Sequence, residues 1–307
     1  MKRILSTALC LALAISLYAQ GSDALPFTCI DRNPVTSAFA GAGSASDENI
    51  AYSAFGNASI IPLSEKVLDA SASYQYWAPS TAKSGHFNAG VSLKLGKRFG
   101  ISAGYAMQRY GSMDVFDGDG NKLQPFSPCD HLFAFGTGFG LTDHLSVGVN
   151  ARYALEKVGP ENRHGGFSGD LYLAWQVFEG LRLTAGVATL GNRVKSADNV
   201  SYAQPAHCKA GVDWVMDFSY YHTVELVGDA EYYFSRNYAI AAGVQYAYNG
   251  VVYVRGGYRF ASPGCVIPSH LGIGIGARFA GFRIDVGYIT ASAALKNTVT
   301  AGLGFSF

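Results

Sequence analysis

Apolar residues alternate with small or polar residues along most of this 307-residue chain. A clear example runs from residue 145 to residue 156. Its apolar positions are Leu145, Val147, Val149, Ala151, Tyr153 and Leu155. The positions between them include Ser146, Gly148, Asn150, Arg152 and Glu156. A period of two is typical of a β-strand, because successive side chains point to opposite faces. The pattern therefore predicts a strand with one apolar face.

About fourteen segments after residue 66 alternate in this way. Each is near the ~10 residues that a tilted strand needs to cross a bilayer. We expect strands at 68–76, 87–95, 99–107, 133–141, 145–155, 167–177, 181–189, 208–216, 224–234, 238–248, 252–260, 271–279, 282–288 and 298–307. The last strand ends on an aromatic residue, Phe307, on its apolar face. Such an ending is typical of outer-membrane β-barrels, whose lipid-facing side is apolar.

The links between these segments alternate between short and long. The short links are Gly96-Lys97, Thr142-Asp143, Glu179-Gly180, Asn249-Gly250 and Ala280-Gly281, which suit tight hairpins. The long links are 111–128, 159–165, 190–204, 261–268 and 291–296. Bacterial barrels have short periplasmic turns and longer external loops. With an even number of strands and the last strand ending in the periplasm, every short link falls on the periplasmic side.

The N-terminal end has the layout of a secretory signal peptide. Lys2 and Arg3 precede an apolar run at 4–17, and small residues around Ala19 offer a cleavage point. We therefore expect residues 1–19 to be removed. No later apolar stretch approaches the ~20 residues of a membrane helix. Only helices and closed barrels satisfy all backbone hydrogen bonds in lipid. We predict an all-β, transmembrane, up-and-down antiparallel barrel of about fourteen strands at 67–307, in the bacterial outer membrane.

A soluble β-sandwich or β-propeller is the alternative fold class, because both contain many short alternating strands. Those folds need a polar exterior, whereas one face of these segments is consistently aliphatic and aromatic. The composition, with 37 Gly, 19 Tyr and 19 Phe, suits a membrane barrel. The net charge of +1 gives no electrostatic argument for a nucleic-acid partner.

Candidate chemistry is sparse. The four cysteines beyond the signal peptide, Cys29, Cys129, Cys208 and Cys265, fit no zinc pattern. The envelope permits disulfides, but the sequence assigns no pairing. Residues 117–121 begin like a calcium loop, yet Lys122 stands where such a loop needs glycine. No nucleophile, base and orienting acid can be assembled. We expect neither an enzyme nor a bound metal or cofactor.

Residues 20–66 do not follow the strand pattern. They combine many small residues with apolar ones such as Phe39, Ile50 and Phe55. A fourteen-stranded ring is wider than the eight-stranded barrel that side chains alone can fill. We therefore predict that this segment plugs the lumen. A disordered periplasmic tail is the alternative, which the apolar residues disfavour.

The polar face of the strands carries two groups of charges. The basic group, with one acid beside it, is Arg255, Arg259, Arg278, Arg283 and Asp285. The acidic group is Asp213, Glu225, Asp229 and Glu231. Because buried charges are normally paired, we expect them to hold the charged residues of the plug. Those residues are Asp31, Arg32, Asp47 and Glu48. The alternative function is that the arginines bind the carboxylate headgroup of an amphipathic ligand.

Several stretches, taken in order along the chain, match a known family. Residues 33–62 form a small-residue run, and Asn57-Ala58-Ser59 stands where the family has Asn-Pro-Ala, so the proline is missing. Further matching stretches are 181–191, 255–260, 281–288 and 295–298. With these stretches the chain resembles the FadL-like outer-membrane β-barrel family, within it the PorV/PorQ-type branch of Bacteroidota.

The resemblance implies a fourteen-stranded barrel with its N-terminal segment inside as a hatch that includes Asn57 and Ala58. It also implies two different activities. FadL-type members let hydrophobic small molecules through the outer membrane, which makes membrane lipid and a hydrophobic ligand the expected partners. PorV-type members act without enzymatic chemistry as protein-binding components of type IX secretion or a surface assembly. A barrel whose plug never opens, with a structural role in the envelope, is a third possibility.

Overall fold

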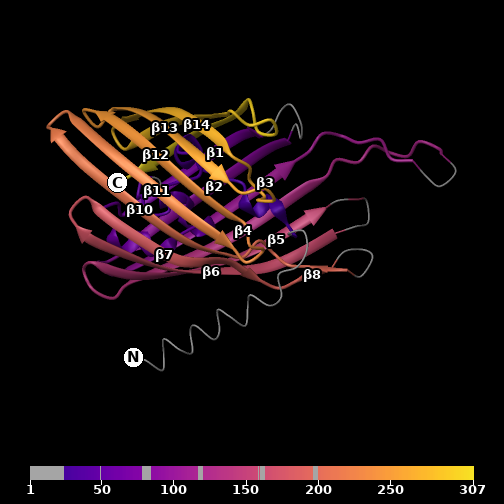
Figure 1. Ribbon diagram of the computed structural model, residues 1–307, viewed down its shortest axis with the longest axis horizontal. Helices are drawn as coiled ribbons and strands as arrows, with labels where there is room; N and C mark the ends of the chain where they lie inside the picture. The colour runs from indigo at the N-terminus through magenta and orange to yellow at the C-terminus, as the bar shows by residue number, and fades with distance from the viewer. Residues whose placement is uncertain are drawn as a thin grey trace, which may run out of the picture.

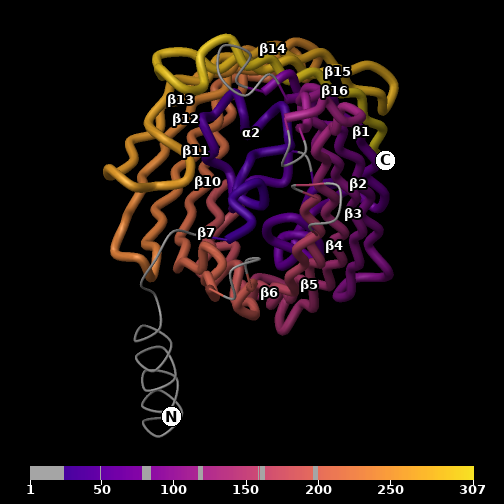
Figure 2. The backbone as a smooth tube through the Cα atoms, turned by 90° about the vertical axis from the view of Figure 1, so that its right-hand side faces the viewer, coloured from indigo at the N-terminus to yellow at the C-terminus, as the bar shows by residue number. Residues whose placement is uncertain are grey.

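The computed structural model describes residues 24–48, 50–77, 84–116, 120–157, 159, 163–195 and 200–307. The predicted signal peptide, residues 20–23 of the predicted plug, and Asp117 to Asp119 of the loop compared with calcium sites lie outside these residues. Fourteen antiparallel strands form one closed barrel (Figures 1 and 2). They are β1 Leu68–Trp77, β2 Ser84–Leu95, β3 Phe99–Arg109, β4 Cys129–Gly140, β5 Leu145–Lys157, β6 Arg163–Phe178, β7 Leu181–Gly191, β10 His207–Ser219, β11 His222–Tyr233, β12 Tyr238–Tyr248, β13 Val252–Ala261, β14 His270–Phe279, β15 Phe282–Thr290 and β16 Thr298–Ser306.

The prediction of an all-β barrel of about fourteen strands is confirmed. Each barrel strand pairs with the next one along the chain, and β1 pairs with β16 to close the ring, so that Ala72 lies opposite Leu303. The backbone N–H groups of Val67 and Leu68 both donate to the carbonyl of Phe307, at 2.7 and 2.9 Å. Two short strands, β8 Val194–Lys195 and β9 Ser201–Tyr202, pair in the link between β7 and β10. The sequence did not predict β8 and β9, because two residues are too short for a pattern of alternation.

The short links form tight hairpins. In two of them both central residues have positive φ, with 53° and 61° at Asn249-Gly250 and 50° and 82° at Ala280-Gly281. Type I′ turns need this backbone, whose twist matches that of the flanking strands. These turns lie at the same end of the barrel as Phe307, which we therefore call the short-turn end. The long links lie at the other end, the loop end.

Burial follows the alternation in the sense expected for a lipid-facing barrel. Outward side chains are apolar and exposed, including Val149 (51% exposed) and Ile275 (62%). Inward polar side chains are buried, including Ser146 and Asn150, which is 1% exposed. Among the described residues, no helix is both long enough and apolar enough to span a membrane.

Residues 24–48 and 50–66, which we call the inner segment, lie within the ring of strands (Figure 2, indigo). They form short helices only: η2 Pro26–Cys29, α2 Pro34–Ala38, η3 Ile50–Phe55 and η4 Ala58–Leu63. At the loop end, Ala24 N donates to Ala203 O at 2.7 Å. At the short-turn end, Lys66 comes two residues before β1. The inner segment therefore runs lengthwise through the barrel.

Asparagine begins two of these helices. The side chain of Asn33 accepts from Val35 N (2.9 Å) at the start of α2, and that of Asn57 accepts from Ser59 N (3.0 Å) at the start of η4. Such caps satisfy amide groups that have no partner within the helix. Proline inside η4, at position 62, and the glycines around α2 keep the helices short.

Candidate functional site

One side of the inner segment packs against glycines of the wall. Helices η3 and η4 lie against β2 to β5. The wall positions that they approach are Gly90, Gly100, Gly104, Gly136, Gly138 and Gly148. A Cβ atom on Gly148 would lie 2.7 Å from Ser59 Cα and 2.8 Å from the carbonyl carbon of Ala58. Backbone therefore lies directly on backbone, and only glycine fits. We call this contact the glycine side.

Hydrogen bonds from wall side chains to backbone carbonyls reinforce the glycine side, including one from Arg152 Nη1 to Phe55 O at 3.3 Å. Asn150 on β5 donates through Nδ2 to Ser53 O (3.0 Å) and Gly56 O (2.6 Å). The hydroxyl of Ser146 donates to Ser59 O. These bonds satisfy carbonyl groups of the short helices that would otherwise be buried without a partner.

The opposite side of the inner segment is held by charged groups of the wall. Residues 44–48, which we call the latch segment, follow α2 and face β7 and β10 to β14. Ser44 donates to Asp229 through its backbone N (3.1 Å) and its Oγ (2.6 Å). Ser46 Oγ donates to Glu225 Oε1 at 2.6 Å. Both acids belong to β11.

Arginines complete the hold on the latch segment. Arg182 of β7 donates to Ala45 O (3.0 Å), and its Nη2 lies 3.8 Å from Asp47 Oδ2. Glu48 forms an ion pair with Arg278 of β14. The same carboxylate lies 3.6 Å from Nη2 of Arg255 on β13. The latch segment is thus held by side chains from β7, β11, β13 and β14.

Both acids of the latch segment are ionised at neutral pH. Burial alone would raise the pKa of Glu48, but Arg278, Lys66 and Arg255 outweigh this effect and hold its pKa below the usual value. Burial likewise opposes ionisation of Asp47, and Arg182 and Lys66 lower its pKa overall. The ammonium group of Lys66 also donates to the backbone carbonyls of Asp47 and Glu48.

The structure places all four predicted arginines in the lumen wall, each beside a carboxylate. Arg255 pairs with Asp285 at 2.6 Å. Arg259 pairs with Glu231 of β11, also at 2.6 Å. Arg283 pairs with Asp69 of β1. Only Arg255 and Arg278 reach an acid of the inner segment. The expectation that the whole basic group holds the inner segment is therefore wrong for Arg259 and Arg283, which pair within the wall.

The expectation of a wall partner is also wrong for Arg32. Its guanidinium donates to three carbonyls of its own segment: Phe27 O (2.8 Å), Ile30 O (2.7 Å) and Thr28 O (3.2 Å). It lies over the ring of Phe55, 5.3 Å from the centroid. Burial, together with nearby positive charge, lowers its pKa to about 10. The turn of η2 brings these carbonyls closer than any wall acid.

Asp31 has no wall partner either, among the described residues. It accepts from Thr36 Oγ1 at 2.6 Å and from Asn33 N at 3.2 Å. Burial raises its pKa, because these two bonds and the distant charges do not offset the loss of water. Local bonds within the inner segment therefore replace the ion pairs that the sequence suggested for Asp31 and Arg32.

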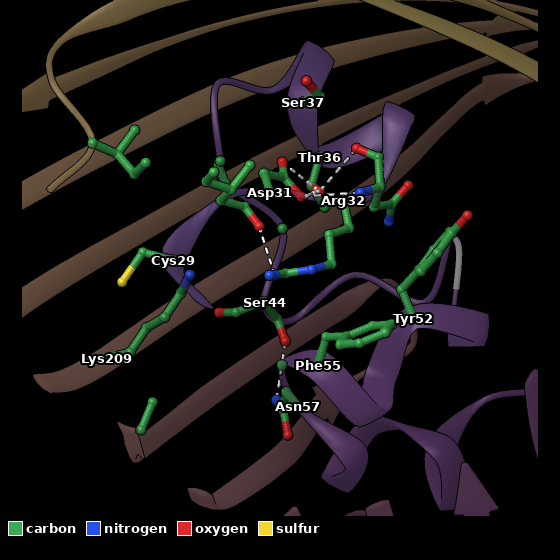
Figure 3. A pocket seen from close by; sticks show the side chains of 18 of the residues that line it. Cys29, Asp31, Arg32, Thr36, Ser37, Ser44, Tyr52, Phe55, Asn57 and Lys209 are labelled. Carbon is green, nitrogen blue, oxygen red and sulfur yellow. Dashed lines mark hydrogen bonds between the residues drawn. The ribbon is translucent and has the colours of Figure 1, made fainter. Parts of the chain in front are cut away.

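Asn57 and Ala58 lie away from the arginines, between the two sides. Asn57 Nδ2 donates to Ser44 O at 3.0 Å, which links η4 to the latch segment (Figure 3). Ala58 is completely buried against the glycine side. The Asn57 side chain caps η4, and Ser59 stands where the resemblance led us to compare an Asn-Pro-Ala motif.

A cavity of about 230 Å³ lies between the inner segment and the wall. Figure 3 shows Asp31, Arg32 and Ser44 around it, with Lys209 of the wall nearby. Its aromatic lining residues are Phe39, Tyr52, Phe55, Trp77, Tyr172 and Tyr233. Its charged wall residues are paired with one another, as in Arg152 with Asp170 and in Lys209 with Glu231 (2.9 Å). The cavity therefore combines aromatic surface with polar groups whose charges are balanced.

The sequence analysis did not single out several charged wall residues of this site, among them Arg182, Lys209, Asp69 and Asp170. The period of two carried a signal for them, since each is a charged residue on the polar face of its strand. Lys209 and Asp213, for example, are four residues apart on β10 and both point inward. Cys129, Cys208 and Cys265 are free thiols, and Cys29 lines the cavity. Within the described part of the chain, no group of His, Cys, Asp or Glu is arranged to hold a metal ion.

The fold matches solved barrels. The toluene transporter TbuX of Ralstonia pickettii is 15% identical, with 91% of this chain and 99% of that chain covered and a TM-score of 0.60. The toluene transporter TodX of Pseudomonas putida is 14% identical, with 94% and 99% covered and a TM-score of 0.60. The monoaromatic hydrocarbon channel CymD is 13% identical, with 91% and 98% covered and a TM-score of 0.63. Neither a protein-family model nor a curated protein sequence matches this chain. The likeness shows that the chain has the fold of an outer-membrane β-barrel.

Proposed function

We propose that this protein is a FadL-like barrel of the bacterial outer membrane through which small hydrophobic molecules pass. The apolar, exposed outer face supports a place in lipid. The observation that carries the proposal is the partly aromatic cavity between the inner segment and the wall. Pockets for small molecules are typically apolar and aromatic, with a few placed polar groups. The solved proteins that share the fold are described as toluene transporters and a monoaromatic hydrocarbon channel, which agrees with this cavity.

In this proposal the inner segment is the plug of the pathway. It runs lengthwise through the ring of strands (Figure 2), and many of its residues line the cavity. A molecule that enters from the loop end meets η2 and then the aromatic residues Phe55 and Tyr52. Passage toward the short-turn end requires the latch segment to move, because it closes the far side of the cavity with Ser46 and Glu48.

A cavity-filling variant tests the proposal. Gly56 lines the cavity, and a Cβ atom there meets nothing within 4 Å. Gly56→Trp should therefore fill the cavity without disturbing the barrel. We expect uptake of labelled toluene by cells with an intact outer membrane to fall about tenfold, since most of the space for a ligand is lost. The matched control is Gly111→Trp, which also has open space around it but lies in a loop. Equal uptake by both variants would contradict the proposal.

A second candidate function is a PorV/PorQ-type role as a protein-binding component of type IX secretion or a surface assembly. The link between β3 and β4 supports it, because its described residues extend from the loop end as an irregular hairpin (Figure 1). Met113, Phe116 and Leu123 are 55%, 58% and 49% exposed there. Exposed apolar residues gathered on one hairpin are typical of a protein-binding surface.

The two functions make different demands on this hairpin. If the protein binds a secreted or surface protein, replacing 112–127 with a short Gly-Ser turn should abolish co-purification of that partner. If the protein is a channel for small molecules, the same variant should keep toluene uptake near the wild-type rate. Measuring both in one strain separates the two functions.

A further inference from the structure

Two acids that the fold brings together in the wall have no ion-pair partner in the described part of the chain. Asp213 of β10 and Glu225 of β11 both face the lumen and are 4% and 2% exposed. Their side chains are within hydrogen-bonding reach of each other. Ionised carboxylates only accept hydrogen bonds, so this contact requires a proton between them.

Glu225 connects this carboxyl pair to the latch segment. One of its oxygens accepts from Ser46 Oγ, and the other accepts from Gln245 Nε2 at 2.5 Å. Gln245 Oε1 in turn accepts from Arg255 Nε at 2.5 Å. Arg255 faces Glu48 at 3.6 Å. A continuous chain of polar contacts therefore runs from the carboxyl pair to both ends of the Ser46 to Glu48 stretch.

The charges around the pair leave little to stabilise a second negative charge. Arg182 acts on Asp213, but it also serves Asp47, Ala45 O and Gln176 Oε1. From the inner segment, Asp47 and Glu48 face the pair, and both are acids. Lys66 and Arg278 are occupied by the latch segment itself. One oxygen of Asp213 makes no hydrogen bond to any described residue.

We propose that Asp213 and Glu225 form a proton-binding site that controls the latch segment. With one proton shared between them, Glu225 stays in place, accepts from Ser46 and holds the latch segment closed. When the proton leaves, two negative charges stand together opposite Asp47 and Glu48, and the latch segment is the one part of this cluster that is not built into the wall. It therefore moves away. The proton site does not depend on the proposed function. The role of the movement does, since the movement would open the far side of the cavity to a transported molecule.

The test is amide hydrogen exchange of residues 44–48 in the full-length protein in lipid nanodiscs, between pH 6 and pH 9. Asp47 and Glu48 stay ionised throughout this range, because the pKa of each lies below its usual value. We expect protection, corrected for the intrinsic pH dependence of exchange, to fall by up to about tenfold per pH unit once the shared proton dissociates. Peptides from η3 and η4 should show no such change.

Asp213→Asn is the decisive variant. Asparagine donates to Glu225 at every pH as the protonated acid does, so protection of the latch segment should become independent of pH. Glu225→Gln, which also removes one titrating group, should do the same and serves if the first variant does not fold. The matched control is Asp130→Asn, an inward and buried acid of β4 that accepts from Tyr110. It should retain the wild-type pH dependence.

Two results would overturn the inference: wild-type protection that does not change with pH, or a pH dependence that persists in both Asp213→Asn and Glu225→Gln. Toluene uptake, measured on the same variants, tests the proposed function separately. A pH-dependent latch segment without any uptake would remove the transport role and leave the proton site. Uptake without pH-dependent exchange would do the reverse.

Discussion

Two parts of the inner segment, helices η3 and η4 and the latch segment, are held to the wall mainly by different physics. On the glycine side, the backbone of η4 packs on the backbone of the wall at Gly138 and Gly148, and among the described residues no ion pair joins η3 or η4 to the wall. On the opposite side, residues 44–48 are held by Asp229, Glu225 and three arginines. Close packing depends on shape, which pH and salt hardly alter. Ion pairs depend on charge, which a single proton alters.

The inner segment therefore has one part whose attachment is insensitive to solution conditions and another whose attachment is sensitive to them. Helices η3 and η4 are fixed to the wall by a fit that only glycine allows. The latch segment is attached by bonds that solution conditions can change. The hydrogen bond from Asn57 to Ser44 joins the two parts. Because each part otherwise contacts different strands, we expect a substitution on one side to have little effect on the attachment of the other.

The largest effect should come from removing the cations that face Glu48. In the double variant Arg255→Ala and Arg278→Ala, Glu48 and Asp285 lose their arginine partners while still buried. Breaking buried pairs in this way costs about 3–5 kcal/mol. We expect most of this cost to appear as loosening of the latch segment, measured as faster protease cleavage at 44–48 and a lower thermal stability.

The control for this experiment is Arg98→Ala. Its ion pair with Asp143 is exposed on the outside of a turn, at 3.7 Å, and exposed pairs contribute little. Unchanged protease resistance and thermal stability in the double variant would contradict a structural role for these two arginines. It would instead favour the alternative that they bind a ligand headgroup.

A smaller loss of stability is expected from a substitution on the glycine side. Gly148→Ala places a methyl group against the backbone of Ala58 and Ser59, and overpacking of this kind costs about 1–3 kcal/mol. Gly256→Ala is the matched control, because the nearest atom to its Cβ is 3.9 Å away. The unfolding midpoint in denaturant should fall for the first variant only. Protease cleavage at 44–48 should stay slow in both, and rapid cleavage in Gly148→Ala would break the proposed independence of the two sides.

The smallest effect should follow from acid. Because the pKa values of Asp47 and Glu48 are lowered in the folded protein, their contribution to stability is complete above their ordinary values. It is lost as the pH falls through the lowered values. The loss is modest, since Arg255 keeps Asp285 as its partner. Exchange at 44–48 should therefore increase below about pH 4, while exchange in η3 and η4 stays constant.

Alternation predicted the barrel and its faces well, for a simple reason. The period of two is fixed by strand geometry, so Arg255, Asp229 and Asp285 could be assigned to the lumen from local sequence alone. The last strand and the short turns then fixed which links share an end. These predictions use only local sequence, so they do not require knowledge of which side chains face each other across the lumen.

Partners within the lumen could not be predicted in the same way. Arg283 and Asp69 lie near opposite ends of the chain, and they meet only because β15 and β1 both flank β16 in the closed ring. The course of the inner segment has no period at all. Arg32 shows this most clearly, because three carbonyls of a nearby turn took the place of the acid that its charge suggested.

The seam between β1 and β16 has a consequence for the order of events in assembly. The hydrogen bonds from Val67 and Leu68 to Phe307 can form only after residue 307 has been made, long after residues 67 and 68. Contacts between residues so far apart in sequence are slow to form. Once they exist, a continuous wall surrounds the inner segment on every side. The inner segment must therefore be inside before the ring closes or enter as it closes, and the seam is the step that commits the chain to hold it.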